Sequence, residues 1–200
     1  MKQHKIKKLS PEVELFGMSC DFIMIIKDWR SVFYKIEKIK PNDIKTIGQI
    51  YPQINRTAYL VVLMIIFESE IKNISDFFKK NEEEEIKLSD FKGSMMERFL
   101  LFMNKVIKIK MNNYEEIEFI NSIISLRNCI VHANGNINEI HSNDKQAIEK
   151  LRQKIKGITI KEGWVNISRA FCLNCSKKVQ YFITGVYDLI RKKYKNTINI

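Results

Sequence analysis

Apolar residues recur at steps of three and four along most of this 200-residue chain, which is the spacing of one face of an α-helix. The first such stretch follows Ser10-Pro11, where Ser suits the N-cap and Pro suits the first turn. It predicts one long helix that ends before Pro41-Asn42. The residues of its apolar seam are Leu15, Met18, Phe22, Ile26, Trp29, Phe33 and Ile36.

The same periodicity predicts further helices in the first two thirds of the chain. A second helix is expected over about 54–80, after a connector that ends near Pro52. A third is expected over about 94–110 and a fourth over 114–132. The acidic run 82–85 between the second and third helices is expected to be a solvated loop.

The pattern changes in residues 158–167. A fifth helix, capped by Asn143 or Asp144, comes before this segment. Apolar and polar residues then alternate on both sides of Glu162-Gly163, which predicts a β-hairpin. Ser168 caps a final helix. The expected fold is therefore all-α, a helical bundle with a small β-hairpin before the C-terminal helix.

A length of 200 residues suggests one domain over residues 1–200, and a hydrophobic fraction of 45% fits a globular protein. The low counts of 3 Pro and 7 Gly favour helices. Residues 1–9 form a short basic arm, expected to be mobile, without the apolar stretch of a signal peptide. The longest apolar run, 59–67, is too short for a membrane span, which needs about 20 residues. We therefore expect a cytoplasmic protein with no membrane partner.

The chain is strongly basic, with 34 Lys and Arg against 23 Asp and Glu, a net charge of +11. A surplus of this size favours a polyanionic partner, and RNA is the leading candidate. The alternative is an ordinary lysine-rich surface, since the many Ile, Lys and Asn residues are typical of an AT-rich genome.

The chain has 4 cysteines. Cys20 and Cys129 lie in apolar helical patterns and are expected to be reduced core residues. Cys172 and Cys175 form one C-x-x-C, but a structural zinc site needs two more ligands with suitable spacing. We therefore favour a helix face with two small side chains over zinc, and we expect no metal and no cofactor.

Candidate chemistry lies at the end of the fourth helix, in Arg127-Asn128-Cys129-Ile130-Val131-His132, which Asn134-Gly135 follow as a turn. Asn128 and His132 are four residues apart and share one face, and Arg127 lies on an adjoining side. An Arg can hold a phosphate and a His can move a proton, which are the minimum parts of a metal-free ribonuclease.

Arg127 and Asn128 fall on or beside the packed stripe of this helix, so each needs a partner. Glu68 or Glu70, which follow the most apolar part of the second helix, could pair with Arg127. Such a pair could be purely structural, or it could hold the Arg fork in place for a ligand.

The spacing of Arg, a polar residue, three further residues and His resembles the R-x4-H signature of HEPN domains. The resemblance covers about 10–193, and a small hairpin before the last helix is also similar to several bacterial HEPN families. It implies an all-helical, metal-independent endoribonuclease of a toxin–antitoxin or phage-defence system. It also implies a homodimer, with RNA as substrate and a cognate antitoxin or defence-system protein as a further partner.

The resemblance gives Arg127, His132 and Asn128 catalytic roles, and the pattern of the chain adds Glu68, Glu70 and Gly135 as supporting residues. Small residues on the fourth helix would then either form a dimer seam or contact another helix of the same chain. These residues are Ser122, Ser125 and Cys129. The alternative function is a non-catalytic HEPN module that binds RNA, a nucleotide or a partner protein.

Overall fold

The computed structural model describes residues 10–38, 45–81, 85–111 and 114–198. The predicted basic arm, Pro41-Asn42 and all of the acidic run except Glu85 lie outside the described residues. The helices are α1 (Pro11–Ile36), α2 (Lys45–Asn81), α3 (Met95–Lys105), α4 (Tyr114–His132), α5 (Ser142–Lys154) and α6 (Arg169–Ile198), with 3-10 turns at Leu88–Asp90 and Ile137–Glu139. Strands β1 (Ile158–Lys161) and β2 (Trp164–Ile167) form the antiparallel hairpin before α6. The predicted all-α fold with a small hairpin is confirmed.

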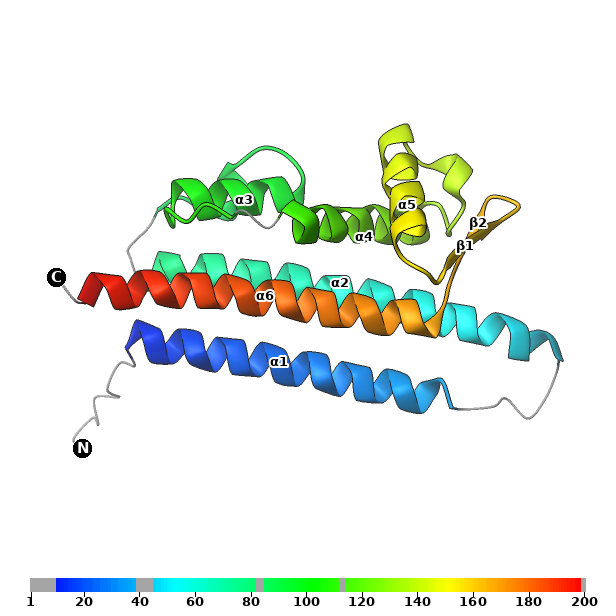
Figure 1. Cartoon of the computed structure of the whole chain (residues 1–200), viewed down its shortest axis with the longest axis horizontal. Helices are drawn as coiled ribbons and strands as arrows, with labels where there is room; N and C mark the ends of the chain where they lie inside the picture. The colour runs from blue at the N-terminus through cyan, green and yellow to red at the C-terminus, as the bar shows by residue number, and fades with distance from the viewer. Residues whose placement is uncertain (1–9, 39–44, 82–84, 112–113, 199–200) are drawn as a thin grey trace, which may run out of the picture.

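The three longest helices, α1, α2 and α6, run side by side along the length of the molecule (Figure 1). α6 contacts both α1 and α2, and α4 contacts α2. α3 and α4 follow one another along one side of this group, and α5 crosses near the C-terminal end of α4 (Figure 1). The end of α4, the start of α5 and the hairpin therefore gather at one end of the molecule.

The apolar seams predicted from the sequence meet in one contiguous core that includes residues of all six helices and both strands. On α1, Leu15, Phe22, Ile26 and Phe33 are almost fully buried, as the spacing predicted. Among the described residues, no helix is long and apolar enough to cross a lipid bilayer.

Serine caps fix two helix starts where the sequence predicted them. The Ser10 side chain accepts a hydrogen bond from the Val13 amide at 3.4 Å, at the start of α1. The Ser168 hydroxyl accepts one from the Phe171 amide at 3.1 Å, at the start of α6. Each cap satisfies a backbone amide that the helix itself leaves without a partner.

The predicted connector up to Pro52 is wrong, because α2 begins at Lys45 and contains Pro52. Proline removes one helical hydrogen bond, but propensity is a weak influence that tertiary contacts override. Such contacts follow directly. Gln53 donates its amide to the Val165 carbonyl at 3.3 Å and accepts from the Ile167 amide at 3.2 Å, so this turn of α2 is joined to β2.

Two other predicted boundaries also differ from the structure. α3 ends at Lys105 rather than near residue 110, because Lys108 adopts a left-handed φ of 62° and the chain turns back. The cap of α5 is His141, not Asn143 or Asp144, and its side chain makes no capping hydrogen bond. Asp144 lies inside the first turn of α5 instead.

Candidate functional site at the end of α4

α4 ends at His132 because the next residues leave helical geometry. Asn134 and Gly135 have φ values of 49° and 86°, which favour Asn and Gly respectively. The Gly135 amide donates to the Cys129 carbonyl at 2.9 Å, and the Gly135 carbonyl accepts from the Val165 amide at 2.9 Å. Gly135 therefore turns the chain after the motif and fastens it to β2.

Arg127 lies at the junction of α4 and α2, with its side chain 23% exposed. Its Nη2 is 3.9 Å from Oε1 of Glu68, and its Nη1 donates to Oδ1 of Asn128 at 3.0 Å. Its Nε is buried and has no hydrogen-bond partner within the described chain. The guanidinium is thus held from two sides, and part of it remains open to solvent.

His132 is exposed and forms no hydrogen bond or ion pair with any residue that the structure describes. On a helix with about 3.6 residues per turn, Arg127 and His132 point about 140° apart. Asn128 lies between these two directions and touches the guanidinium. The three motif residues therefore form a short polar edge, and no hydrogen bond or ion pair with a described residue holds the imidazole.

Of the two acids considered for Arg127, the structure pairs Glu68 and places Glu70 elsewhere. Glu70 is buried, and its Oε1 accepts a hydrogen bond from the Tyr187 hydroxyl of α6. Its Oε2 accepts from Nδ2 of Asn73 at 3.0 Å. Burial raises the pKa of the Glu70 carboxyl above its ordinary value of 4.5, although both hydrogen bonds oppose this shift. Glu70 therefore belongs to the α2–α6 packing, and it forms no hydrogen bond or ion pair with the motif among the described residues.

Replacing Glu70 with Gln is expected to make stability less dependent on pH. Because the folded carboxyl has the higher pKa, the unfolded chain loses this proton first as the pH rises above 4.5. The free energy of unfolding therefore falls from that pH up to the raised pKa, and the loss persists above it. Gln keeps an oxygen for Tyr187 and cannot ionise. Urea unfolding measures the free energy of unfolding at about pH 4 and about pH 7. The decrease between these two pH values should be smaller for Glu70→Gln than for wild type.

Glu118→Gln is the matched control for this measurement, because the ion pair with Lys154 lowers the pKa of Glu118. Because its pKa is lower in the folded state, the Glu118 carboxylate stabilises the protein at pH values above its unfolded pKa. Glu118→Gln removes this gain, so the loss of unfolding free energy between about pH 4 and about pH 7 should be larger than in wild type, not smaller. An equal pH dependence in wild type and Glu70→Gln would contradict the assignment of Glu70.

The small residues of α4 pack within the chain rather than forming an exposed seam. The Ser125 hydroxyl donates to Oδ1 of Asp144 on α5. Ser122 is buried and donates to the Glu118 carbonyl at 2.9 Å, and Cys129 is fully buried. Contact within the same chain therefore accounts for these three residues, through the Ser125–Asp144 hydrogen bond to α5 and the burial of Ser122 and Cys129, and the homodimer itself stays a prediction.

The two cysteines of the C-x-x-C motif are buried in the core through α6. Burial raises the pKa of the Cys172 thiol to about 12, and it raises that of Cys175 well above its ordinary value. Thiolates are the form that binds metal, so these surroundings disfavour metal binding. Across the described ranges, no group of three or more His, Cys, Asp and Glu residues could hold a metal ion.

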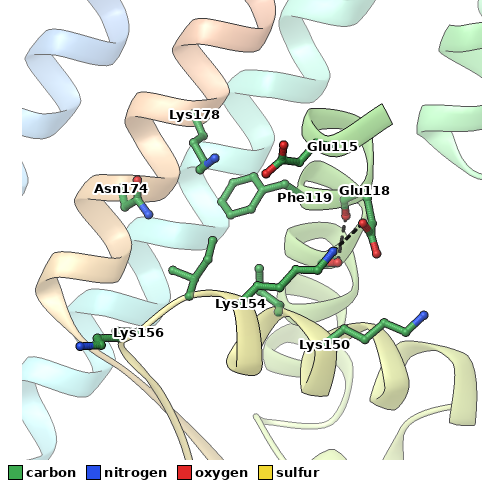
Figure 2. Close-up of a pocket in the computed structure, with 11 residues that line it drawn as sticks. Glu115, Glu118, Phe119, Lys150, Lys154, Lys156, Asn174 and Lys178 are labelled. Atoms are coloured by element: carbon green, nitrogen blue, oxygen red, sulfur yellow. Dashed lines mark hydrogen bonds and ion pairs between the residues drawn. The ribbon is translucent and has the colours of Figure 1, made fainter. Parts of the chain in front are cut away.

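The sequence interpretation missed a cleft of about 610 Å³ between α4, α5 and the first half of α6 (Figure 2). Lys150 and Lys154 line it from α5, and Lys178 lines it from α6. The spacing of four between Lys150 and Lys154 places both on one face of α5, which was the available local signal. Lys178 joins them only through the tertiary fold.

Comparison of the chain with protein-family models, with curated proteins and with solved structures finds no match. The R-x4-H motif and its surroundings therefore carry the functional argument.

Proposed function

We propose that this protein is a metal-independent endoribonuclease of the HEPN type, acting in a toxin–antitoxin or phage-defence system. The observation that carries the proposal is the polar edge at the end of α4. There Glu68 and Asn128 hold a partly exposed Arg127 guanidinium, and His132 stands exposed without a partner in the described chain. A held cation and an exposed imidazole five residues apart on one helix suit phosphate binding and proton transfer, respectively.

The reaction would be a transesterification within RNA. His132 of one protomer takes the proton of a ribose 2′-hydroxyl, and that oxygen bonds to the adjacent phosphorus. The bond from phosphorus to the 5′-oxygen breaks, and the partner subunit's His132 protonates the leaving oxygen. Arg127 stabilises the negative charge on the phosphoryl oxygens, and Asn128 orients the guanidinium. The products are a 2′,3′-cyclic phosphate and a 5′-hydroxyl, and the need for a 2′-hydroxyl restricts the reaction to RNA.

This mechanism requires a homodimer, because one motif supplies one His whereas the reaction uses a base and an acid. Exposed apolar residues near the ion pair support such a contact. Ile65 of α2 and Val131 of α4 are 51% and 44% exposed. Ile65 precedes Glu68 by three residues and Val131 follows Arg127 by four, so both lie about one helical turn from the pair. A two-fold contact over this area would bring two His132 side chains to one cleft.

Val131→Asp is expected to convert the dimer to a monomer and to abolish cleavage while Arg127 and His132 stay intact. A charge in the centre of an apolar contact is buried without a partner. Light scattering at micromolar concentration measures the assembly. Met24→Asp is the control, since Met24 is 61% exposed on α1. A monomeric wild type would contradict the dimer, and disruption by Met24→Asp alone would locate the contact on α1.

The proposed activity is tested by incubating the purified protein with total RNA in excess EDTA. Cleavage should persist, and the new 3′ ends should carry 2′,3′-cyclic phosphate. The ends are distinguished by their resistance to direct ligation and by mass spectrometry of short substrates. Cleavage that requires added magnesium would contradict the proposal, since a metal would then supply the chemistry assigned to His132 and Arg127.

RNA binding should weaken steeply with salt. The chain carries a net charge of +11, and each phosphate contact with Lys or Arg releases counterions. With roughly six phosphate contacts, affinity should fall about 1,000-fold between about 50 and 200 mM salt. A labelled oligoribonucleotide titrated at several salt concentrations gives the slope. Binding that ignores salt over this range would favour a protein partner instead.

The second candidate is the non-catalytic HEPN module that binds RNA, a nucleotide or a partner protein. One observation favours it: the Arg127–Glu68 pair joins α4 to α2, so it can hold the bundle together without any substrate. The comparison of His132 and Arg127 variants in the Discussion separates the two candidates.

A further inference from the structure

The lysine-lined cleft between α4, α5 and α6 has an apolar wall and a charged rim. Phe119, Leu151 and Ile155 form the wall. Its volume of about 610 Å³ falls within the range of roughly 300–1,000 Å³ of small-molecule sites. Such sites combine an apolar lining with a few polar groups that fix the orientation of the ligand.

The rim carries a surplus of positive charge. Its charged residues are Lys150, Lys154, Lys156 and Lys178 against Glu115 and Glu118, four positive against two negative. Lys154 is neutralised, because its Nζ lies 2.7 Å from Oε2 of Glu118. The other three lysines form no hydrogen bond or ion pair with residues that the structure describes. They are available to an anion.

Figure 2 shows the ends of the Lys178 and Glu115 side chains close to the Phe119 ring, and Asn174 on the α6 side of the cleft. Lys178 Nζ lies 4.9 Å from the centroid of the Phe119 ring, so a cation is held against the apolar wall. The Asn174 amide has no hydrogen-bond partner in the described part of the chain and can both donate and accept. The Glu115 carboxylate can accept hydrogen bonds from hydroxyl groups.

We propose that this cleft binds a nucleoside phosphate, either as a free nucleotide or as one nucleotide of an RNA strand. The base packs on the wall formed by Phe119, Leu151 and Ile155, and its polar edge meets Asn174. The ribose hydroxyls donate to Glu115, as vicinal hydroxyls do to a carboxylate in dinucleotide sites. The phosphate oxygens bind Lys178 and the lysines at the rim.

This site is separate from the polar edge at the end of α4. Arg127 faces Glu68 of α2, whereas the cleft opens toward α5 and α6. Along α4, Ser122 at the near end of the cleft and Arg127 are separated by about 7.5 Å of helix axis and point about 140° apart. The inference therefore goes beyond the proposed ribonuclease activity, and it can be tested in a chain whose motif has been removed.

The test is calorimetric titration of the full-length His132→Ala protein with ADP, GDP, CDP and UDP in separate experiments. At least one should bind with a stoichiometry of one per chain. Inorganic pyrophosphate and the matching nucleoside, titrated alone, should each bind at least about tenfold more weakly, because each lacks half of the contacts. Pyrophosphate that binds as tightly as the nucleotide would overturn the role of the apolar wall.

Lys178→Ala in the same background should weaken nucleotide binding about tenfold or more, the scale of one lost charge-assisted hydrogen bond. The matched control is Lys177→Ala, which removes the same charge from the next residue of α6. Lys177 lines a different groove, beside Arg30 and Tyr34 of α1, and its loss should leave the affinity unchanged. If Lys178→Ala fails to fold in a thermal melt, the exposed pair Lys150→Ala and Lys156→Ala takes its place. Equal affinities in the control and cleft variants would overturn the proposal.

A six-nucleotide oligoribonucleotide distinguishes the two sources of the ligand. If it displaces the bound nucleotide, or binds in a manner that Lys178→Ala weakens, RNA occupies the cleft. If it leaves the nucleotide in place, the ligand is a free nucleotide. Absence of binding by all four nucleotides and by the oligoribonucleotide would overturn the proposal without touching the ribonuclease activity, which is measured at His132.

Discussion

Replacing His132 with Ala is expected to lower RNA cleavage about 100-fold or more, the scale of losing a general acid and base. The protein should still fold, because His132 is exposed and makes no hydrogen bond or ion pair with residues of the described chain. RNA binding should largely persist, since Lys and Arg contacts to phosphates supply most of that affinity. If expression of the wild type is toxic, the same change should relieve the toxicity.

His141→Ala is the matched control for this experiment. His141 is also exposed and also lies at a helix end, where it caps α5 without a side-chain hydrogen bond. Its loss should change neither cleavage nor stability. Equal cleavage by wild type and His132→Ala would refute the enzyme, and the non-catalytic binding module would become the better account.

Arg127→Lys is expected to reduce cleavage by a similar factor, about 100-fold, while keeping the positive charge. The planar guanidinium of Arg127 can contact Glu68 and Asn128 and still donate hydrogen bonds to a phosphate. The ammonium group of Lys cannot make all of these contacts at once. The measurement is the single-turnover rate on a short RNA at saturating enzyme, which separates the chemical step from binding. A rate within about threefold of the wild type would show that Arg127 acts only as a bulk positive charge.

Stability measurements on the same variants separate a structural role of Arg127 from a chemical one. Arg127 is only 23% exposed and joins α4 to α2, so Arg127→Lys should lower the free energy of unfolding more than His132→Ala does. Arg152→Lys is the control, because Arg152 forms an exposed pair with Glu149 one turn away on α5. Exposed ion pairs contribute little to stability, so Arg152→Lys should leave the free energy of unfolding nearly unchanged. Loss of cleavage in Arg127→Lys at unchanged stability would assign Arg127 to the chemistry alone.

The pattern of apolar and polar residues predicts the class of fold and most of the element boundaries. The seam of Leu15, Phe22 and Phe33 is helical because a period near 3.6 residues leaves one side for burial. The hairpin follows from alternation around Glu162-Gly163, where φ values of 53° and 86° suit a tight turn. These features depend on neighbours in the chain, so local spacing was enough to predict them.

Tertiary contacts determined the helix boundaries at the positions where the local sequence pattern was misleading. Pro52 suggested a connector, but the Gln53 amide joins this turn of α2 to β2, which stabilises a helix that propensity disfavours. α3 stopped early because the chain turns back at Lys108. No local pattern carries such information, since each contact joins residues far apart in the chain.

The candidate site divides in the same way. The sequence placed Arg127, Asn128 and His132 together, because a helix fixes the relative directions of residues four and five apart. It left open whether Glu68 or Glu70 meets Arg127, since either could face α4 until the rotation of α2 was known. It also left open what covers Ser125, and it did not reveal the cleft around Lys178, which needs α4, α5 and α6 in place. Helical spacing sets directions along one helix, and only the packing of helices against each other decides which side chains meet.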